Sequence, residues 1–339
     1  MLPYGYVVIS SKNIRDRLKE IDLFLLDQYK ASHPEKKRDW RTYEEQYAVR
    51  IKEAMTHLEP LVNEAVAGFQ VPAGPGRPHR LTLKQRVLLL LLQRLFRESN
   101  RMMASMLTIF SILSGIDVRY KTVERLYSDQ EVCVAIGNLH KIMLRKKGIT
   151  EVDACGDGTG YALTIKKHYA TEAEKQKDKA KEANVGEKRM FVFSFKITDI
   201  KSKMYIAGGI SSISEKRAFD STLEMADDVG VALRSMRLDK YYSCPAYVDR
   251  FGEETAVFVI PKKNATLKGS WKWKRQLFKF YSDTMAYLQE FYQREHSENG
   301  WSVDKRRFGW SIPQRRNDRI GVSDRCTMLW HNLLLMGTG

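Results

Sequence analysis

Cysteine and long apolar runs are scarce in this chain of 339 residues. The four cysteines are widely spaced and form no C-x2-C pair, which argues against a zinc module and against a disulfide framework. The longest apolar run, Val87 to Leu92, is far shorter than the ~20 residues that span a bilayer. The N-terminus also lacks the layout of a signal peptide. We therefore expect a soluble cytoplasmic protein without a membrane partner.

Acidic side chains are outnumbered by basic ones. The chain carries 57 Lys and Arg against 41 Asp and Glu, which gives a formal net charge of +16. This surplus predicts a polyanionic partner, and an aromatic content of 11 % argues against a disordered basic tail. Purely structural nucleic-acid-binding proteins carry a similar surplus, so charge alone does not select a function. The length suits two or three domains with a sizeable core.

The first part of the chain has the apolar spacing of helices. Ile14 and Leu18 belong to a helical pattern that extends over residues 11–69. Residues 71–79 hold three prolines and two glycines, which predicts a linker. We therefore place an N-terminal helical region with its linker at residues 1–75.

A second helical region is expected at residues 76–148. Thr82 and Gln85 offer a capping box ahead of a leucine-rich helix. Residues 100–113 and 121–127 resemble a helix-turn-helix, although an ordinary αα-hairpin fits the same pattern. In the first interpretation the second helix would present to DNA the residues Tyr120, Lys121, Thr122 and Arg125.

After Gly148 the pattern changes from helix to strand. The expected elements are strands at 150–156, 161–167, 190–198 and 203–210, a helix at 215–230, a strand ending at Asp239 and a strand at 257–260. The charged segment 171–187 has no apolar stripe and predicts a solvated hairpin arm or helix. This succession predicts an α/β domain at residues 149–339.

Two aspartates stand where predicted strands end. Asp157 opens the run Asp-Gly-Thr-Gly after an apolar strand, and Asp239 opens Asp-Lys-Tyr-Tyr after another. Asp153 lies on the same strand face as Asp157 by the two-residue period. It lacks the Gly-Thr-Gly sequence, for which we expect a turn that admits a ligand.

One glutamate lies between two cations in a helical pattern. Glu298 follows Arg294 by four residues and precedes Lys305 by seven. At about 100° per residue these side chains and Phe291 share one face if the helix is unbroken. Such a face could hold a metal ion and grip phosphates, or it could be a solvated i, i+4 ion pair. Glu295 shares the stripe, but only Glu298 has both flanking cations.

Together these motifs resemble those of the DDE transposases of prokaryotic insertion sequences. In the class with the motif Y-x2-R-x3-E-x6-K this chain matches three of four positions and has Phe291 in place of the tyrosine. The resemblance covers roughly residues 150–320. It implies an RNase H-like mixed sheet as the catalytic domain, with a small basic insertion at about 262–282, preceded by an all-α DNA-binding region.

The resemblance implies a two-metal site. Asp157, Asp239 and Glu298 would bind two Mg²⁺ ions, with Mn²⁺ able to substitute, and Asp157 would bridge both ions. Mg²⁺ prefers oxygen ligands, so three carboxylates suffice. Two ions ~3.5–4 Å apart can activate the attacking oxygen and stabilise the leaving oxygen at phosphorus.

The resemblance also implies DNA contacts around this site. Arg294 and Lys305 are similar to the family's phosphate-binding pair. The other residues that we expect to contact DNA are Tyr242, Lys262, Lys263, Trp271, Trp273, Arg306 and Arg307, with Arg315, Arg316 and Arg319 extending the basic track.

Trp271 and Trp273 lie in a segment, Lys262 to Lys279, that contains seven basic residues and no acid. Basic residues neutralise phosphates, and aromatic rings stack on unpaired bases. As a strand, this segment would place both rings on one face. The alternative is that the tryptophans belong to the core.

The sequence thus predicts a DNA transposase that cleaves the ends of its element and joins them to target DNA. Its expected partners are double-stranded DNA, as terminal inverted repeats and as target, and a second copy of the chain within the DNA complex. It would act at the prokaryotic nucleoid. Two alternatives remain open: a catalytically inactive, transposase-derived regulator and an RNase H-like nuclease.

Overall fold

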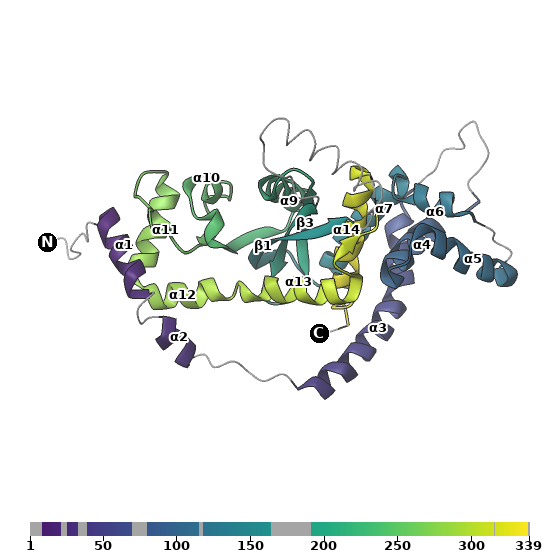
Figure 1. The fold of residues 1–339 in the computed structure, drawn as a ribbon, viewed down its shortest axis with the longest axis horizontal. Coiled ribbons are helices and arrows are strands. Elements are labelled where there is room, and N and C mark those ends of the chain that lie inside the picture. The colour runs from purple at the N-terminus through teal and green to yellow at the C-terminus, as the bar shows by residue number, and fades with distance from the viewer. Residues whose placement is uncertain are drawn as a thin grey trace, which may run out of the picture.

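The computed structural model describes residues 9–21, 26–32, 39–69, 80–114, 118–163, 191–314 and 316–337. The predicted linker at 71–79, the charged segment 171–187 and Arg315 lie outside the described residues. The described chain is a mixed α/β molecule in which helices surround a six-stranded sheet (Figure 1). No helix within these ranges is both long and apolar enough to cross a bilayer.

The sheet combines antiparallel and parallel strands. Its members are β1 (Glu151–Leu163), β2 (Phe191–Asp199), β3 (Tyr205–Ser211), β4 (Ala232–Leu238), β5 (Ala256–Phe258) and β6 (Ser311–Ile312). The first five lie in the order β3-β2-β1-β4-β5, and β6 pairs with the end of β1. β1, β2 and β3 are antiparallel neighbours, whereas β4, β5 and β6 run parallel to their partners. The strands predicted at 190–198, 203–210, 231–238 and 257–260 are confirmed within a few residues.

β1 continues without a break from the strand predicted at 150–156 into the start of the one predicted at 161–167, so the predicted Gly-Thr-Gly turn is wrong. Residues 164–167 lie outside the described residues. Gly156 and Gly158 lie on one face of β1, where there is no room for a side chain. An added Cβ would lie 2.5 Å from Met236 Cε at the first position and 2.6 Å from Glu215 Oε1 at the second. The glycines therefore permit close packing in a continuous strand.

One face of the sheet is covered by α9 (Glu215–Val229), which confirms the helix predicted at 215–230. Its N-cap Ser214 accepts the backbone N–H of Arg217, and Phe219 packs edge-to-face on Phe195 of β2. The opposite face carries α12 (Thr284–Tyr292), α13 (Glu295–Phe308) and α14 (Asn317–Leu333). In Figure 1, α12 and α13 follow one another along one side of the sheet.

Every described element ahead of β1 is a helix. These are α1 (Ser11–Glu20), α2 (Leu26–Ser32), α3 (Trp40–Val66), α4 (Leu83–Phe96), α5 (Asn100–Ser114), α6 (Tyr120–Leu126) and α7 (Gln130–Lys146). The predicted capping box of Thr82 and Gln85 is present at the start of α4.

The front helices share a core with the last helix of the chain. α3, α4 and α7 pack against α14. Trp330 Nε1 of α14 donates to the Leu91 carbonyl at 2.7 Å, and Arg94 Nε donates to Thr327 Oγ1 at 2.7 Å. The predicted boundaries after residues 75 and 148 remain predictions, but the packing is continuous between these helices and the sheet domain.

The N-terminal helix instead lies against the segment predicted as an insertion. α1 packs on α11 (Trp271–Ser282), as Figure 1 shows. The Leu267 N–H donates to Ser11 Oγ at 3.2 Å, and the Arg17 guanidinium lies 5.3 Å from the centre of the Tyr281 ring. The first helix is therefore separated from α3 and joins a distant part of the chain.

Candidate active site

Asp157 and Asp239 lie side by side on neighbouring strands. β1 and β4 are parallel, and their register pairs Gly156 with Leu238. The residue after each of these is an aspartate, Asp157 within β1 and Asp239 directly after β4, and paired positions of parallel strands face the same side of the sheet. Both side chains are half-buried. Asp239 directly follows β4 and caps the short helix η2 (Lys240–Tyr242) by accepting the Lys240 N–H.

The helical pattern across residues 291–305 is interrupted, so the condition of an unbroken helix is not met. α12 ends at Tyr292 and α13 begins at Glu295. The Arg294 N–H donates to the Phe291 carbonyl at 3.1 Å, which closes a tighter turn than an α-helix. The Glu290 carbonyl accepts Arg237 Nε at 3.0 Å. The interruption arises where a side chain from β4 enters the helical hydrogen-bond ladder.

Two of the predicted cations meet β1 on the face that carries Asp157. Arg294 Nη1 lies 3.8 Å from Asp157 Oδ1. Lys305 Nζ donates to Thr159 Oγ1 at 2.5 Å. Asp157 and Thr159 are two residues apart on a strand and therefore share a face. Despite the interruption, the structure brings both cations to the strand of the first aspartate.

Glu298 occupies a position between these two cations on α13. Trp301, one turn later, packs against Tyr161 with ring centres 6.1 Å apart. Positions 294, 298, 301 and 305 recur at helical spacing, so the backbone places Glu298 on the stripe that faces β1. The side chain of Glu298 lies outside the described part of the structure.

The two rival carboxylates have other partners. Asp153 accepts Arg234 Nε at 3.1 Å and the Ser235 hydroxyl, which commits it to a network on the sheet. Glu295 is exposed at the start of α13. Burial raises the pKa of Tyr29, and the negative charge of Glu295 raises that pKa further. Tyr29 of α2 also packs on Tyr292 with ring centres 4.6 Å apart, so the start of α13 at Glu295 lies beside α2.

Lys305 is half-buried among rings and charges. Its Nζ lies 5.4 Å from the centre of the Tyr161 ring and 5.1 Å from that of Trp310. Burial lowers the pKa of Lys305, the carboxylate of Asp157 works to raise it, and the ammonium of Lys196 lowers it further. A phosphate placed beside this lysine would favour its charged form.

A buried polar cluster beneath α13 was missed by the sequence prediction. Lys196 of β2 is 1 % exposed, and its Nζ lies 3.6 Å from Asp304 Oδ2 and 3.5 Å from Asp324 Oδ1. His331 Nδ1 lies 2.8 Å from Asp304 Oδ1, and Tyr205 donates its hydroxyl to Asp304 Oδ2 at 2.9 Å. The cluster ties α13 to β2, β3 and α14.

The carboxylate of Asp304 is stabilised by its neighbours in this cluster. Burial works to raise the pKa of Asp304, but His331 and Lys196 outweigh it and hold that pKa below its usual value. The other ring nitrogen of His331 lies 3.0 Å from the Lys203 carbonyl. The signal in the sequence was the single lysine in the apolar strand around Lys196.

The donor chemistry of the site fits a hard divalent cation. The described candidate ligands are the oxygen atoms of Asp157 and Asp239, and Mg²⁺ prefers such ligands. The described side chains contain no group of three or more His, Cys, Asp or Glu placed to hold a metal. Glu298, the third expected ligand, is not among the described side chains.

The amino-acid sequence is similar to that of an archaeal protein. Over 283 residues, the chain is 42 % identical to the probable transposase for insertion sequence element ISA1214 of Archaeoglobus fulgidus, and the match covers 84 % of each protein. The chain belongs to the insertion-sequence transposases. No protein-family model matches this transposase. No solved structure matches it either.

Two of the expected DNA contacts of this transposase are wrong, because the side chains are buried. Tyr242 is fully buried, and its hydroxyl donates to Glu215 at 2.5 Å. Trp273 is 2 % exposed, and its Nε1 donates to the Thr266 carbonyl at 2.9 Å. Both rings therefore belong to the core. Trp271 is 75 % exposed and remains a candidate contact.

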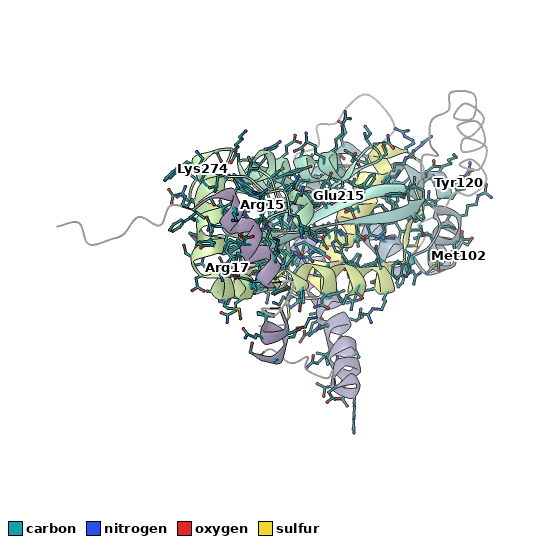
Figure 2. The ribbon with its side chains drawn as sticks, turned by 60° about the vertical axis from the view of Figure 1, so that its left-hand side comes forward. Arg15, Arg17, Met102, Tyr120, Glu215 and Lys274 are labelled. Atoms are coloured by element: carbon teal, nitrogen blue, oxygen red, sulfur yellow. The ribbon has the colours of Figure 1, made fainter. Side chains whose placement is uncertain are left out.

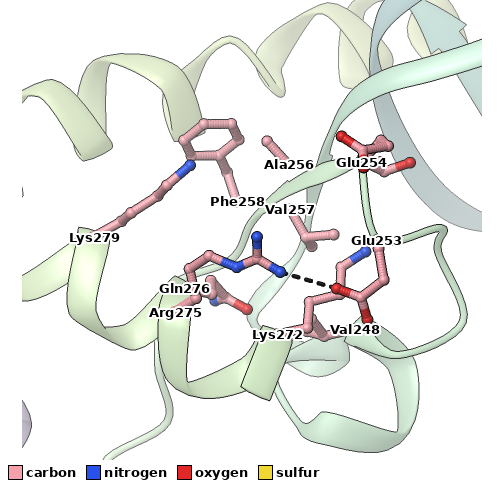
Figure 3. Close-up of a pocket in the computed structure, with 11 residues that line it drawn as sticks. Val248, Glu253, Glu254, Ala256, Val257, Phe258, Lys272, Arg275, Gln276 and Lys279 are labelled. Atoms are coloured by element: carbon pink, nitrogen blue, oxygen red, sulfur yellow. Dashed lines mark hydrogen bonds and ion pairs between the residues drawn. The ribbon is translucent and has the colours of Figure 1, made fainter. Parts of the chain in front are cut away.

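The tryptophans differ because they lie on the helix α11 and not on a strand, which would have placed both rings on one face. Ser270 caps the helix, and positions 271 and 273 then lie about 200° apart around it. Lys272 also faces inward and donates to the Phe251 carbonyl at 3.1 Å. A small cavity of about 120 Å³ next to this lysine is shown in Figure 3, with an ion pair of 2.9 Å between Arg275 and Glu253.

The remaining predicted contacts are at least partly exposed. Lys263, Arg306, Lys121 and Arg125 are exposed, whereas Lys262 and Arg307 are half-buried. Lys262 Nζ donates to the Tyr241 carbonyl at 2.9 Å. Of the extended basic track, Arg316 pairs with Asp318 and Arg319 pairs with Glu124, so these two have protein partners.

Proposed function

We propose that this protein is a DNA transposase that cleaves the ends of its insertion sequence and joins them to target DNA. Its active site would be formed by Asp157, Asp239 and Glu298. One observation carries the proposal. Two aspartates lie side by side, one in β1 and one directly after β4, and α13 crosses the same face with the position of Glu298 between Arg294 and Lys305. Family membership supports the same reaction.

We infer that the sheet domain is RNase H-like. The support is its topology: three antiparallel strands, the helix α9, and then two strands parallel to β1 in the order β3-β2-β1-β4-β5. In that arrangement the first and fourth strands are central neighbours. Acidic residues at their adjoining positions converge on one face, as Asp157 and Asp239 do here.

The chain's own residues would divide the work as follows. When bound, two Mg²⁺ ions would activate the attacking oxygen and stabilise the leaving oxygen. Asp157, Asp239 and Glu298 would hold these ions, and Mn²⁺ has the same preference for oxygen ligands. Arg294 and Lys305 would bind phosphates on either side, since each lies on the β1 face.

Two outlying surfaces would hold DNA and lie at opposite ends of the molecule. Figure 2 shows Tyr120 with Met102 at one end and Lys274 at the other. The first surface consists of α5 and α6 with Lys121 and Arg125. The second is the outer face of α11, where Trp271 and Lys274 line an open groove of about 610 Å³. In a complex of two copies of the chain, one end of the element could contact the first surface on one copy and the second surface on the other copy.

The test uses purified protein and DNA that carries the element's terminal repeats. We expect Asp157→Asn, Asp239→Asn and Glu298→Gln each to reduce cleavage by more than about a hundredfold, because even residues behind metal ligands contribute ~10–100-fold. Binding to end DNA should remain near the wild-type level. Glu295→Gln is the matched control and should retain activity.

Two results would contradict the assignment. Full cleavage by any of the three variants would remove that residue from the site. If Glu295→Gln loses cleavage while Glu298→Gln keeps it, the third metal ligand is Glu295, one helical turn earlier. If the wild-type protein binds the ends but cleaves nothing in Mg²⁺ or Mn²⁺, the protein is the inactive regulator.

A further inference from the structure

The junction between α12 and α13 has no local cause in the sequence. Residues 284–299 contain neither glycine nor proline, the usual causes of an interruption. In a continuous α-helix the Arg294 N–H would donate to the Glu290 carbonyl, four residues earlier. It donates to the Phe291 carbonyl instead, at 3.1 Å. The cause must therefore lie in the tertiary structure.

Arg237 of β4 occupies the place of the missing donor. Its Nε donates to the Glu290 carbonyl at 3.0 Å, and its Nη2 pairs with the Glu290 carboxylate. Arg237 is 3 % exposed, and its guanidinium lies 5.0 Å from the centre of the Phe258 ring. Its remaining terminal nitrogen, Nη1, donates to Ser235 Oγ at 2.5 Å. The guanidinium is thus held on three sides in one orientation.

We propose that Arg237 is a positioning residue that sets the rotation of α13, and with it the placement of Arg294 and Glu298 over the aspartates. Arg237 lies in β4 two residues before Asp239, which directly follows the strand, so the two positions face the same side by the two-residue period. The same arginine therefore connects the strand of the second aspartate to the helix of the glutamate. This inference rests on the proposed function of the site.

The size of the effect follows from helix geometry. A tight turn advances about 120° per residue and an α-helix about 100°, so two residues in a tight turn rotate the following helix by roughly 40°. At a radius of ~5–6 Å this rotation moves a side chain by roughly 4 Å. Metal–ligand distances tolerate only about 0.2 Å. The junction therefore decides whether Glu298 can act with the aspartates.

The experiment compares Arg237→Gln and Arg237→Lys with Arg234→Gln in the full-length protein. Lysine lacks the fork that reaches a carbonyl and a carboxylate together. Arg234 is an exposed arginine on the same strand that pairs with Asp153 and Glu151, so it controls for loss of a β4 cation. The readouts are hydrogen exchange of residues 291–300, melting temperature, end-DNA binding, cleavage, and the Mg²⁺ concentration at half-maximal rate.

We expect both Arg237 variants to remain folded and to bind end DNA. Amide exchange at 291–300 should rise by at least about tenfold, since a hydrogen bond to a charged group is lost, while α9 and α14 exchange as in the wild type. Cleavage should fall by about tenfold or more, and half-maximal rate should need more Mg²⁺, because outer residues tune metal affinity by ~10–100-fold. Arg234→Gln should leave all readouts near the wild-type values.

Unchanged exchange at 291–300 in both variants would overturn the inference. A uniform rise in exchange with a lower melting temperature and an unchanged Mg²⁺ requirement would also overturn it, because that is general destabilisation. If Arg237→Gln does not fold, Arg237→Lys decides the question. Exchange needs no catalysis, so a wild-type protein without cleavage would contradict the proposed function and leave this result intact.

Discussion

At the residue scale, the two tryptophans of α11 differ in their exposure to solvent. The sequence shows an aromatic pair in an acid-free basic segment, and both rings could serve DNA or the core. The structure divides them, because the segment is helical: Trp273 is buried and Trp271 is exposed. The sequence therefore identified the two candidate rings but not which of them is exposed. That depends on the secondary structure, since a helix and a strand distribute alternate residues differently.

This division gives opposite expectations for two neighbouring substitutions. Trp273→Ala should destabilise the protein by ~3–5 kcal/mol, as for other buried aromatic residues, and should reduce every reaction step in proportion to the folded fraction. Trp271→Ala should change the melting temperature little, spare the first nick and slow the later steps by about the ~1–3 kcal/mol of one base stack. Nicking, joining and melting are measured on the same preparations. Equal slowing of all steps in folded Trp271→Ala would end the stacking role.

At the scale of elements, local patterns located helices and strands but not their junctions. The capping box of Thr82 and the strand that leads into Asp239 follow from short-range rules. The continuity of β1 through Gly158 and the break before Glu295 do not. Each depends on a partner distant in sequence, Glu215 in the first case and Arg237 in the second. A single sequence contains no signal for such contacts.

One helix–strand contact should make stability depend on pH. His140 of α7 is fully buried, its Nε2 lies 2.8 Å from the Ile206 carbonyl of β3, and burial lowers its pKa to about 4. The unfolded chain, with a histidine pKa near ~6.5, binds a proton that the folded chain excludes. His140 therefore contributes stability above pH ~6.5 that is lost as pH falls toward its folded value.

The measurement compares urea unfolding of the wild type and His140→Gln between pH ~7.5 and ~4, the range set by the two pKa values. Glutamine can keep the donor to Ile206 but does not titrate. We expect the stability advantage of the wild type to shrink by roughly 2–3 kcal/mol over this range, at about 1.36 kcal/mol per unit. If the difference in unfolding free energy between the two proteins does not change with pH, His140 has the same protonation in the folded and unfolded states.

At the scale of the whole molecule, charge predicted the partner class but not which surface holds it. Many of the basic residues pair within the protein: Arg319 with Glu124, and Arg86 with Asp129. The ionic contacts to DNA phosphates must come from the other basic residues, those that are exposed. Lys121 and Arg125 on α6 belong to it, although Lys121 lies 3.0 Å from Glu124.

Salt dependence can assign this surface without isolating a fragment, which would lose its core partner α14. The logarithm of the binding constant for end DNA falls linearly with the logarithm of the salt concentration, with a slope of about 0.9 per phosphate contact. Lys121→Ala with Arg125→Ala should reduce that slope by about two, one for each lost contact. Lys216→Ala, an exposed lysine on α9, is the control and should leave the slope unchanged. An unchanged slope in the double variant would place DNA recognition elsewhere.

The packing of α14 against α4 also constrains how the protein is made. Leu91 and Trp330, joined by a hydrogen bond, lie 239 residues apart. At 5–20 residues per second a ribosome needs roughly 12–48 s to synthesise that interval. During this time the leucine-rich face of α4 lacks its final cover. A gene copy that is truncated before α14 would therefore leave an unfinished core, and so would not yield a stable DNA-binding competitor of the intact protein.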